Sequence, residues 1–209
     1  VFTLRNSLLF AIIAFITQGS FNYTDTLLPI FTVQKLGWTN LAYSQFYATA
    51  TLVGGVSGML IGGILIDKFG KIFMLNIYFF LLIVLTAGLA FLHAYWINTW
   101  FISSFMIIYQ VLYVFATIGV FATAMQCCWK KISATQFTLY MTISNIGRIV
   151  GAKLIGPMTS SFNWEYTFLS FSIFIAVAWI LIRFMHISHQ VKRVAELEGR
   201  DATKEFTAI

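Results

Sequence analysis

The sequence predicts an all-α fold, namely a polytopic membrane protein built as a bundle of six transmembrane helices. Hydrophobic residues make up 59% of its 209 residues and charged residues only 10%, whereas soluble domains have roughly 45–50% apolar and about 25% charged residues. Aromatic residues reach 18%, which suits lipid-facing surfaces and membrane interfaces. Six segments are long enough to cross a bilayer, which takes ~20 mostly apolar residues.

Short connections join the six expected spans. The spans cover residues 7–33, 42–66, 72–93, 98–125, 134–158 and 166–186. Residues 1–188 are therefore expected to form the bundle, and residues 189–209 a polar tail of mixed charge. Because residue 1 is Val and not Met, we also expect the chain to be a fragment.

Basic residues indicate the orientation of the bundle. One side carries only Lys35, and the other carries ten basic residues: Arg5, Lys68, Lys71, Lys130, Lys131, Arg183, Lys192, Arg193, Arg200 and Lys204. Cytoplasmic loops are enriched in Lys and Arg, so both termini are expected in the cytoplasm. The net charge of +6 is then a topology signal, and the expected partner is the lipid bilayer and not a nucleic acid. An aromatic belt is expected at the outer ends, formed by Trp38, Trp96, Trp100 and Trp164.

Cysteine and histidine residues give no sign of metal or redox chemistry. Cys127 and Cys128 are adjacent, which matches no CxxC site. His93, His186 and His189 lack the HExxH spacing of zinc enzymes. We therefore expect no metal, no cofactor and no enzymatic activity.

The first span, 7–33, carries a polar stripe. Gln18, Asn22 and Asp25 recur at i, i+4 and i+7 and so share one helical face. This face is expected to line a cavity, because it could not face lipid. Pro29 removes a backbone hydrogen bond one turn later, so we expect the helix to bend or break near it.

The second span, 42–66, is marked by glycine. Gly54, Gly58 and Gly62 lie at i, i+4 and i+8, where missing side chains let a neighbouring helix approach closely. The third and sixth spans, 72–93 and 166–186, hold few polar side chains and are expected to face lipid.

The fourth and fifth spans resemble the first in carrying polar faces. The expected cavity-lining residues on them are Gln110, Tyr113, Gln136, Tyr140, Asn145 and Arg148. Three further charges lie within the spans, namely Asp25, Arg148 and Lys153, and they need explanation because a central charge costs at least ~2.5–3.5 kcal/mol. Arg148 could pair with Asp25 across the bundle or meet an anionic substrate, and both interpretations stay open. Lys153 is close enough to the outer end to reach the interface.

The turn after the second span carries the most specific motif in the chain. Gly63, Asp67, Lys68, Gly70 and Lys71 fit the pattern G-x-x-x-D-[RK]-x-G-[RK], which resembles the loop between the second and third helices of each half in the major facilitator superfamily. Gly63 would allow tight packing and Gly70 a sharp turn. We interpret these five residues as a conformational latch.

A second resemblance covers the start of the fifth span. Ala134-Thr135-Gln136-Phe137, followed by Asn145 and Gly147, is similar to the eleventh helix of the anhydromuropeptide permease and acetyl-CoA transporter branch. The resemblance implies that the chain is the C-terminal half of a twelve-helix transporter whose N-terminal half is missing. It also implies a bacterial inner-membrane symporter that moves a muropeptide or related metabolite with protons.

The function predicted from the sequence is therefore secondary active transport of a small polar solute by alternating access. The alternative is a self-contained six-helix channel or assembly module that dimerises through the glycine stripe. Substrate identity, coupling ion and direction are left open by the residues alone.

Overall fold

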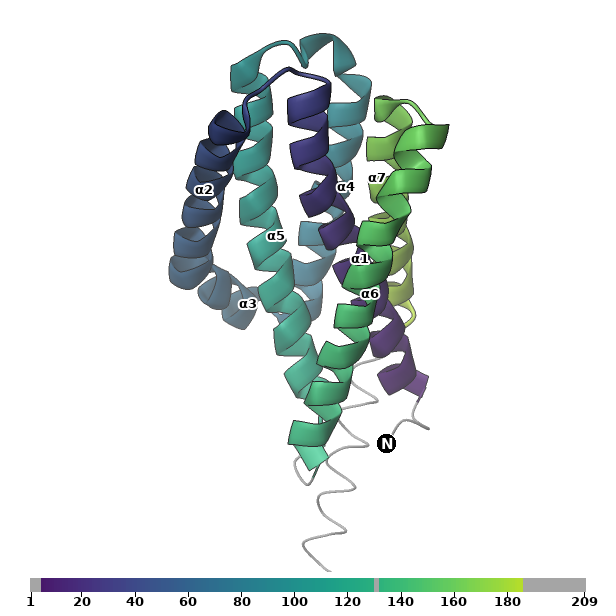
Figure 1. The fold of residues 1–209 in the computed structure, drawn as a ribbon. Helices are drawn as coiled ribbons and strands as arrows, with labels where there is room; N and C mark the ends of the chain where they lie inside the picture. Colours follow the sequence, from purple (N-terminus) through teal and green to yellow (C-terminus); the bar gives the residue numbers. More distant parts are fainter. Residues whose placement is uncertain (1–4, 130–131, 186–209) are drawn as a thin grey trace, which may run out of the picture.

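The computed structural model describes residues 5–129 and 132–185, and these residues form a bundle of helices without a strand (Figure 1). The helices are α1 (Arg5–Gln34), α2 (Asn40–Ser57), the π-helix η1 (Gly58–Gly62), α3 (Gly63–Phe69), α4 (Lys71–Phe91), the 3-10 helix η2 (His93–Tyr95), α5 (Thr99–Cys127), α6 (Ser133–Ser161) and α7 (Trp164–Arg183). Because α2, η1 and α3 form one continuous run, the bundle has six long helical runs. The expected all-α membrane bundle is confirmed.

Four of these runs are long and apolar enough to span a membrane by length and composition, namely residues 40–69, 71–91, 99–127 and 164–183. The helices α1 and α6 are equally long, with 30 and 29 residues, but carry more polar side chains. They pack against each other along much of their length (Figure 1). The expected tail, 189–209, and His186 lie outside the described residues.

Local sequence signals explain where several helices begin. The Thr39 side chain accepts a hydrogen bond from the amide of Ala42 (3.1 Å) and caps α2. The Asn98 side chain accepts one from the amide of Trp100 (3.0 Å) and caps α5. Both residues satisfy amides that the first helical turn leaves without partners.

The glycine stripe of α2 and η1 faces α5. A Cβ at Gly54 would lie 3.0 Å from the backbone oxygen of Gln110, and one at Gly58 would lie 2.5 Å from Val114 Cγ1. A Cβ at Gly62 would meet Ile118. The close approach predicted for this stripe is therefore present within the chain, and the stripe is covered.

Gly63 behaves differently from the expectation. No atom lies within 4 Å of the position of its missing Cβ. The glycine that packs tightly here is its neighbour Gly62, which faces Ile118. Gly70 does take the conformation expected of a sharp turn, with φ of 90°, and it separates α3 from α4.

The helices α1 and α6 cross at backbone contact. A Cβ at Gly147 would collide with the carbonyl oxygen of Phe15, and one at Gly151 would collide with that of Gly19. A Cβ at Gly19 would in turn lie 3.0 Å from the Gly147 oxygen. Only glycine lets two helix backbones approach this closely.

The structure bears on two expectations, the break at Pro29, which does not occur, and the membrane-interface position of Trp96. Helix α1 continues through Pro29 to Gln34 without a break. Trp96 is only 4% exposed, donates its ring N–H to the Leu89 oxygen (2.9 Å) and packs on Phe31. Its hydrogen bond is satisfied inside the bundle, so it needs no membrane interface.

The helices α4 and α7 pack together behind α1 in the view of Figure 1. A hydrogen bond between the hydroxyls of Thr86 and Ser172 (2.7 Å) joins them. Large apolar side chains such as Phe80, Val84 and Ile173 are exposed on these helices. This surface is of the kind that faces lipid.

Gly151→Ala should lower the free energy of unfolding by about 1–3 kcal/mol, the usual range for overpacking, because the new Cβ meets the Gly19 carbonyl. Gly88→Ala is the control, since no atom lies within 4 Å of its Cβ position on α4. It should be neutral or add up to ~1 kcal/mol, because Ala favours helix. Thermal unfolding in detergent measures both variants, and equal midpoints would contradict the close crossing.

Candidate functional site

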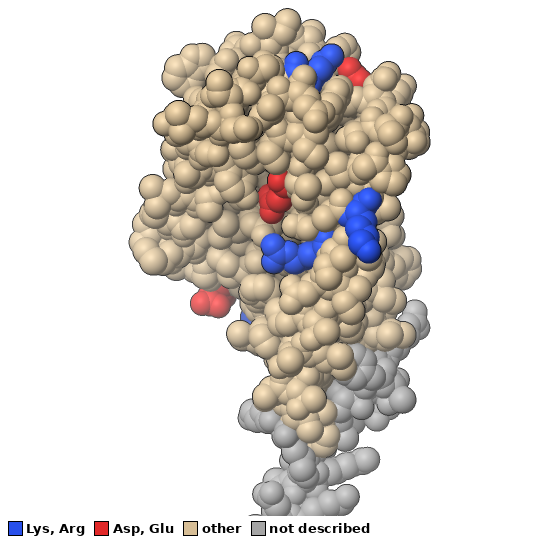
Figure 2. Space-filling model, in the orientation of Figure 1, with Lys and Arg blue, Asp and Glu red and all other residues tan. Residues whose placement is uncertain are grey.

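The charged groups inside the helical runs gather on one side of the bundle. Figure 2 shows acidic and basic atoms near one another at mid-height, and the other charges in this view lie toward the upper and lower ends of the bundle. Asp25 comes from the middle of α1 and Arg148 from the middle of α6. The crossing of α1 and α6 at their glycines positions these two residues.

Asp25 is partly buried, and its Oδ1 atom accepts no hydrogen bond from the described residues. Its charge acts on the hydroxyls of four tyrosines that come from α2 and α5, namely Tyr43, Tyr47, Tyr109 and Tyr113. Tyr43 and Tyr47 stack with ring centroids 5.5 Å apart, and Tyr109 and Tyr113 stack at 6.3 Å. The acid thus lies beside a tyrosine cluster, defined by these four residues.

Arg148 completes the site from α6. Its side chain is exposed, and its charge acts on Asp25, Tyr47 and Tyr113. The Asn22 side chain donates to the backbone oxygen of Arg148 at 2.8 Å, which ties α1 to α6 one turn before Asp25. A site with a carboxyl, a guanidinium and aromatic hydroxyls can bind a polar solute that carries charges at both ends.

The residues expected to line a cavity divide into two groups. Asn22, Asp25 and Tyr113 are partly exposed, and Asn145 and Arg148 are exposed. Gln18, Gln110, Gln136 and Tyr140 are instead buried inside the bundle, with exposed fractions of 5% or less. The first group lies on the surface around Asp25 and Arg148, which we call the open face. The second group does not reach this surface.

Gln136 and Tyr140 hold the turn between α5 and α6. The Gln136 side chain accepts from the amide of Trp129 (3.1 Å) and donates to the Cys127 oxygen (3.1 Å) and the Tyr140 hydroxyl (2.9 Å). The Tyr140 ring packs edge-on against Phe10. These bonds satisfy the buried polar groups, so the structure places both residues in a structural position and not on the open face.

Sequence reasoning missed the contribution of α2. Tyr43 and Tyr47 reach the site from this helix, which the sequence marked only by its glycines. Tyr47 interacts with the side chain of Gln110, so the buried Gln110 supports the cluster from behind. The spacing of Tyr43 and Tyr47 at i and i+4 was the available signal.

The latch motif lies at the other end of the α2–α3 run, away from the tyrosine cluster. Asp67 and Lys68 are exposed at the end of α3, and Lys68 lies over the ring of Phe69 at 5.4 Å. The Gly70 amide donates to the Ile66 oxygen (2.9 Å) and closes α3. Lys71 opens α4, and its charge reaches Cys127 at the end of α5.

The family model of the Major Facilitator Superfamily matches residues 1–152. The chain belongs to this superfamily. Curated relatives include proteins of Rickettsia typhi and Rickettsia prowazekii, each 26% identical over 172 residues. Both carry the provisional name transporter AmpG 2. A third protein of that name, from Rickettsia felis, is 27% identical over 169 residues.

Each of these matches covers 77% of the chain and 39% of the relative. The chain therefore spans about two fifths of the length of these relatives. Membership of the superfamily identifies the chain as an integral membrane protein of a transporter family, and the AmpG-like relatives agree with the branch predicted from residues 134–147. It also weighs against the predicted alternative of a channel or assembly module.

Proposed function

We propose that the chain is one six-helix half of a secondary active transporter that works by alternating access. The observation that carries this proposal is the open face with Asp25, Arg148 and the tyrosine cluster inside the helical runs. Charges at the centre of a bilayer are costly, so this face requires protein or water against it. A second six-helix half, expected N-terminal to Val1, would cover it and enclose the site between the halves.

Asp25 is the proposed coupling residue. Its Oδ1 atom is buried without a hydrogen-bond donor among the described residues, and Arg148 acts on it without satisfying that oxygen. A carboxyl in such a place can take up a proton when it faces one side and release it when it faces the other. The resemblance to the muropeptide permease branch implies that the coupling is proton symport.

The proposed solute is a small polar molecule such as a peptidoglycan-derived muropeptide or a related metabolite. Arg148 would hold an anionic group of the solute, because a guanidinium makes paired hydrogen bonds to carboxylate or phosphate. Its exposed side chain supports this role over a purely structural ion pair. The proposed location is a bacterial inner membrane, with both termini in the cytoplasm.

The latch of Gly63, Asp67, Lys68, Gly70 and Lys71 is proposed to favour one facing state over the other. Its charged members lie at the tip of a helix pair, where a rocking half would move most. A latch of this kind acts only through contacts that differ between the two states. Gly63 and Gly70 contribute backbone freedom and turn geometry, since neither meets a neighbour at its Cβ position.

The alternative, an assembly module that dimerises through the glycine stripe, lacks a free surface. Gly54, Gly58 and Gly62 already pack on α5 within the chain. We therefore do not retain it.

Asp25→Asn should abolish solute accumulation driven by a pH gradient, because the amide cannot carry a proton. Exchange of labelled for unlabelled solute should persist, which shows that the site still binds and moves. Both are measured in proteoliposomes with the complete transporter, and Asp25→Glu should restore accumulation in part. Undiminished accumulation by Asp25→Asn would exclude the coupling role.

Arg148→Ala should weaken solute binding by roughly tenfold to a hundredfold, the range for loss of a charged hydrogen bond of ~1.5–3 kcal/mol. Lys153→Ala on the same helix is the matched control and should change binding by no more than about twofold, as for a surface charge. Binding is measured with anhydro-muropeptides, acetyl-CoA and simple sugars. Equal losses in the two variants would argue against Arg148 as the substrate contact.

Asp67→Asn should slow transport by about tenfold, within the range of typical conformational coupling energies, without changing the amount of protein in the membrane. Lys35→Gln, at the opposite end of the bundle, removes an exposed charge as a control. Uptake and membrane insertion are measured together. A normal uptake rate in Asp67→Asn would refute the latch.

A further inference from the structure

A groove begins between α6 and α7, where α1 forms its floor, and continues over α7 to the end of α4 and η2. Three adjoining cavities of about 190, 320 and 370 Å³ make it up. The first and second share Phe174, and the second and third share Tyr166 and Leu169. The cavities thus increase in volume from the middle of α6 toward the first turn of α7, where the third cavity also touches Ala90 and Phe91 of α4.

The groove lies on the flank of α6 that faces away from the charged site. Val150 lines the groove, and it is rotated about 200° around the helix from Arg148. Gly147 and Gly151 line the deep end of the groove, where α6 packs on α1. It is therefore separate from the proposed transport site.

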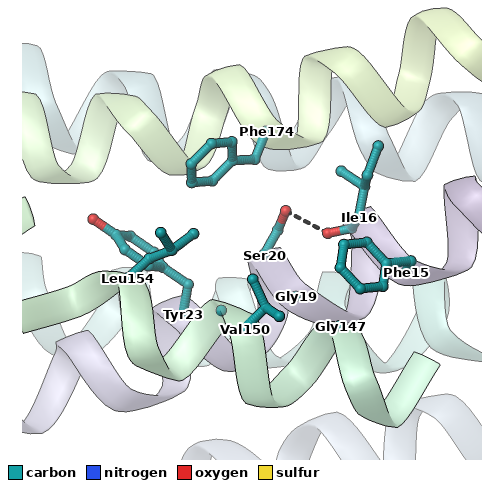
Figure 3. A pocket seen from close by; sticks show the side chains of 10 residues that line it. Phe15, Ile16, Gly19, Ser20, Tyr23, Gly147, Val150, Leu154 and Phe174 are labelled. Atoms are coloured by element: carbon teal, nitrogen blue, oxygen red, sulfur yellow. Dashed lines mark hydrogen bonds between the residues drawn. The ribbon is translucent and has the colours of Figure 1, made fainter. Parts of the chain in front are cut away.

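The hydroxyl groups in the walls of the deep part already donate hydrogen bonds within the protein. Figure 3 shows the Ser20 hydroxyl turned to the Ile16 oxygen, to which it donates at 2.7 Å, below the ring of Phe174. The Tyr23 hydroxyl donates to the Thr167 oxygen (3.1 Å), and so does Ser170 (2.8 Å). The remaining walls are apolar, so the occupant of this part is apolar as well.

The mouth of the groove has a different chemistry. His93, Asn163 and Glu165 line the third cavity, beside the first turn of α7. The Asn163 side chain does not cap that helix, so its amide is available as a donor. A helix N-terminus attracts an anion, and Glu165, which lies in the first turn of α7, attracts a cation.

We propose that the groove holds one acyl chain of a phospholipid whose headgroup carries a primary ammonium. The phosphate would lie at the start of α7 with Asn163, and the ammonium at Glu165. From Gly147 to Phe162 the groove follows α6 for about 22 Å, at 1.5 Å per residue. One leaflet of a bilayer is about 15 Å deep, so the groove accommodates a chain that runs parallel to the helices.

The polarity of the groove favours a lipid over a protein partner. The groove is apolar in its deep part and polar only at its mouth. An amphiphile in one leaflet has the same arrangement, with an apolar chain and a polar headgroup. The open face with Asp25 and Arg148, which requires a protein partner, lies on the other flank. A lipid here would hold α6 and α7 apart while both remain packed on α1.

The test is native mass spectrometry of the complete transporter with phosphatidylethanolamine and phosphatidylglycerol of equal chain length. Leu154→Trp and Ile173→Trp fill the groove and should lower the bound fraction about fivefold or more, equivalent to ~1 kcal/mol. Val84→Trp adds the same bulk on exposed α4, outside the groove, and should retain the lipid. Unfolding midpoints show that the variants are folded.

A second variant tests the headgroup. Glu165→Gln keeps the groove and should reduce the preference for phosphatidylethanolamine about threefold, as expected for one exposed ion pair. Unchanged lipid binding in Leu154→Trp and Ile173→Trp, or an equal loss in Val84→Trp, would overturn the proposal. So would a dimer that the groove variants abolish, because a second copy would then be the occupant.

Discussion

The backbone contact between α1 and α6 is the interaction on which the other features depend. Gly19, Gly147 and Gly151 let the two helices meet without intervening side chains. Their crossing brings Asn22 to the Arg148 carbonyl and places Asp25 near the arginine. The same glycines also line the deep end of the groove between α6 and α7. One crossing therefore sets up the charged face on one flank of α6 and the apolar groove on the other.

The second helical run joins the ends of the molecule. It begins beside the tyrosine cluster, packs on α5 through its glycines and ends at Asp67 and Gly70. A movement of α2 relative to α5 would thus displace residues of both the tyrosine cluster and the latch. Glycine contacts favour such movement, because smooth backbone surfaces have few interlocking side chains. This arrangement supplies a physical route between the proposed solute site and the proposed latch.

Composition and the length of apolar segments were sufficient to predict the six helical runs, because a bilayer demands such segments. The site was harder to predict. Gln136 and Arg148 follow a repeat of four, yet residues twelve apart are rotated by about 120° in an α-helix. Gln136 therefore faces the bundle interior while Arg148 faces out. The repeat Gly147-x-x-x-Gly151 was visible as a helix-crossing signal, but its partner Gly19 could be identified only from the structure.

The π-helix at Gly58–Gly62 has a geometric consequence for the run that contains it. In a regular α-helix, glycines spaced by four residues drift about 40° around the axis at each step. A π-helix makes i→i+5 bonds and has a wider turn, so its residues rotate less and the drift is reversed. Gly54, Gly58 and Gly62 can then stay in line with α5 over two steps. Deleting one residue between 58 and 62 would restore regular winding and leave Asp67 on nearly the same side of the bundle, because a π turn holds one residue more than an α turn.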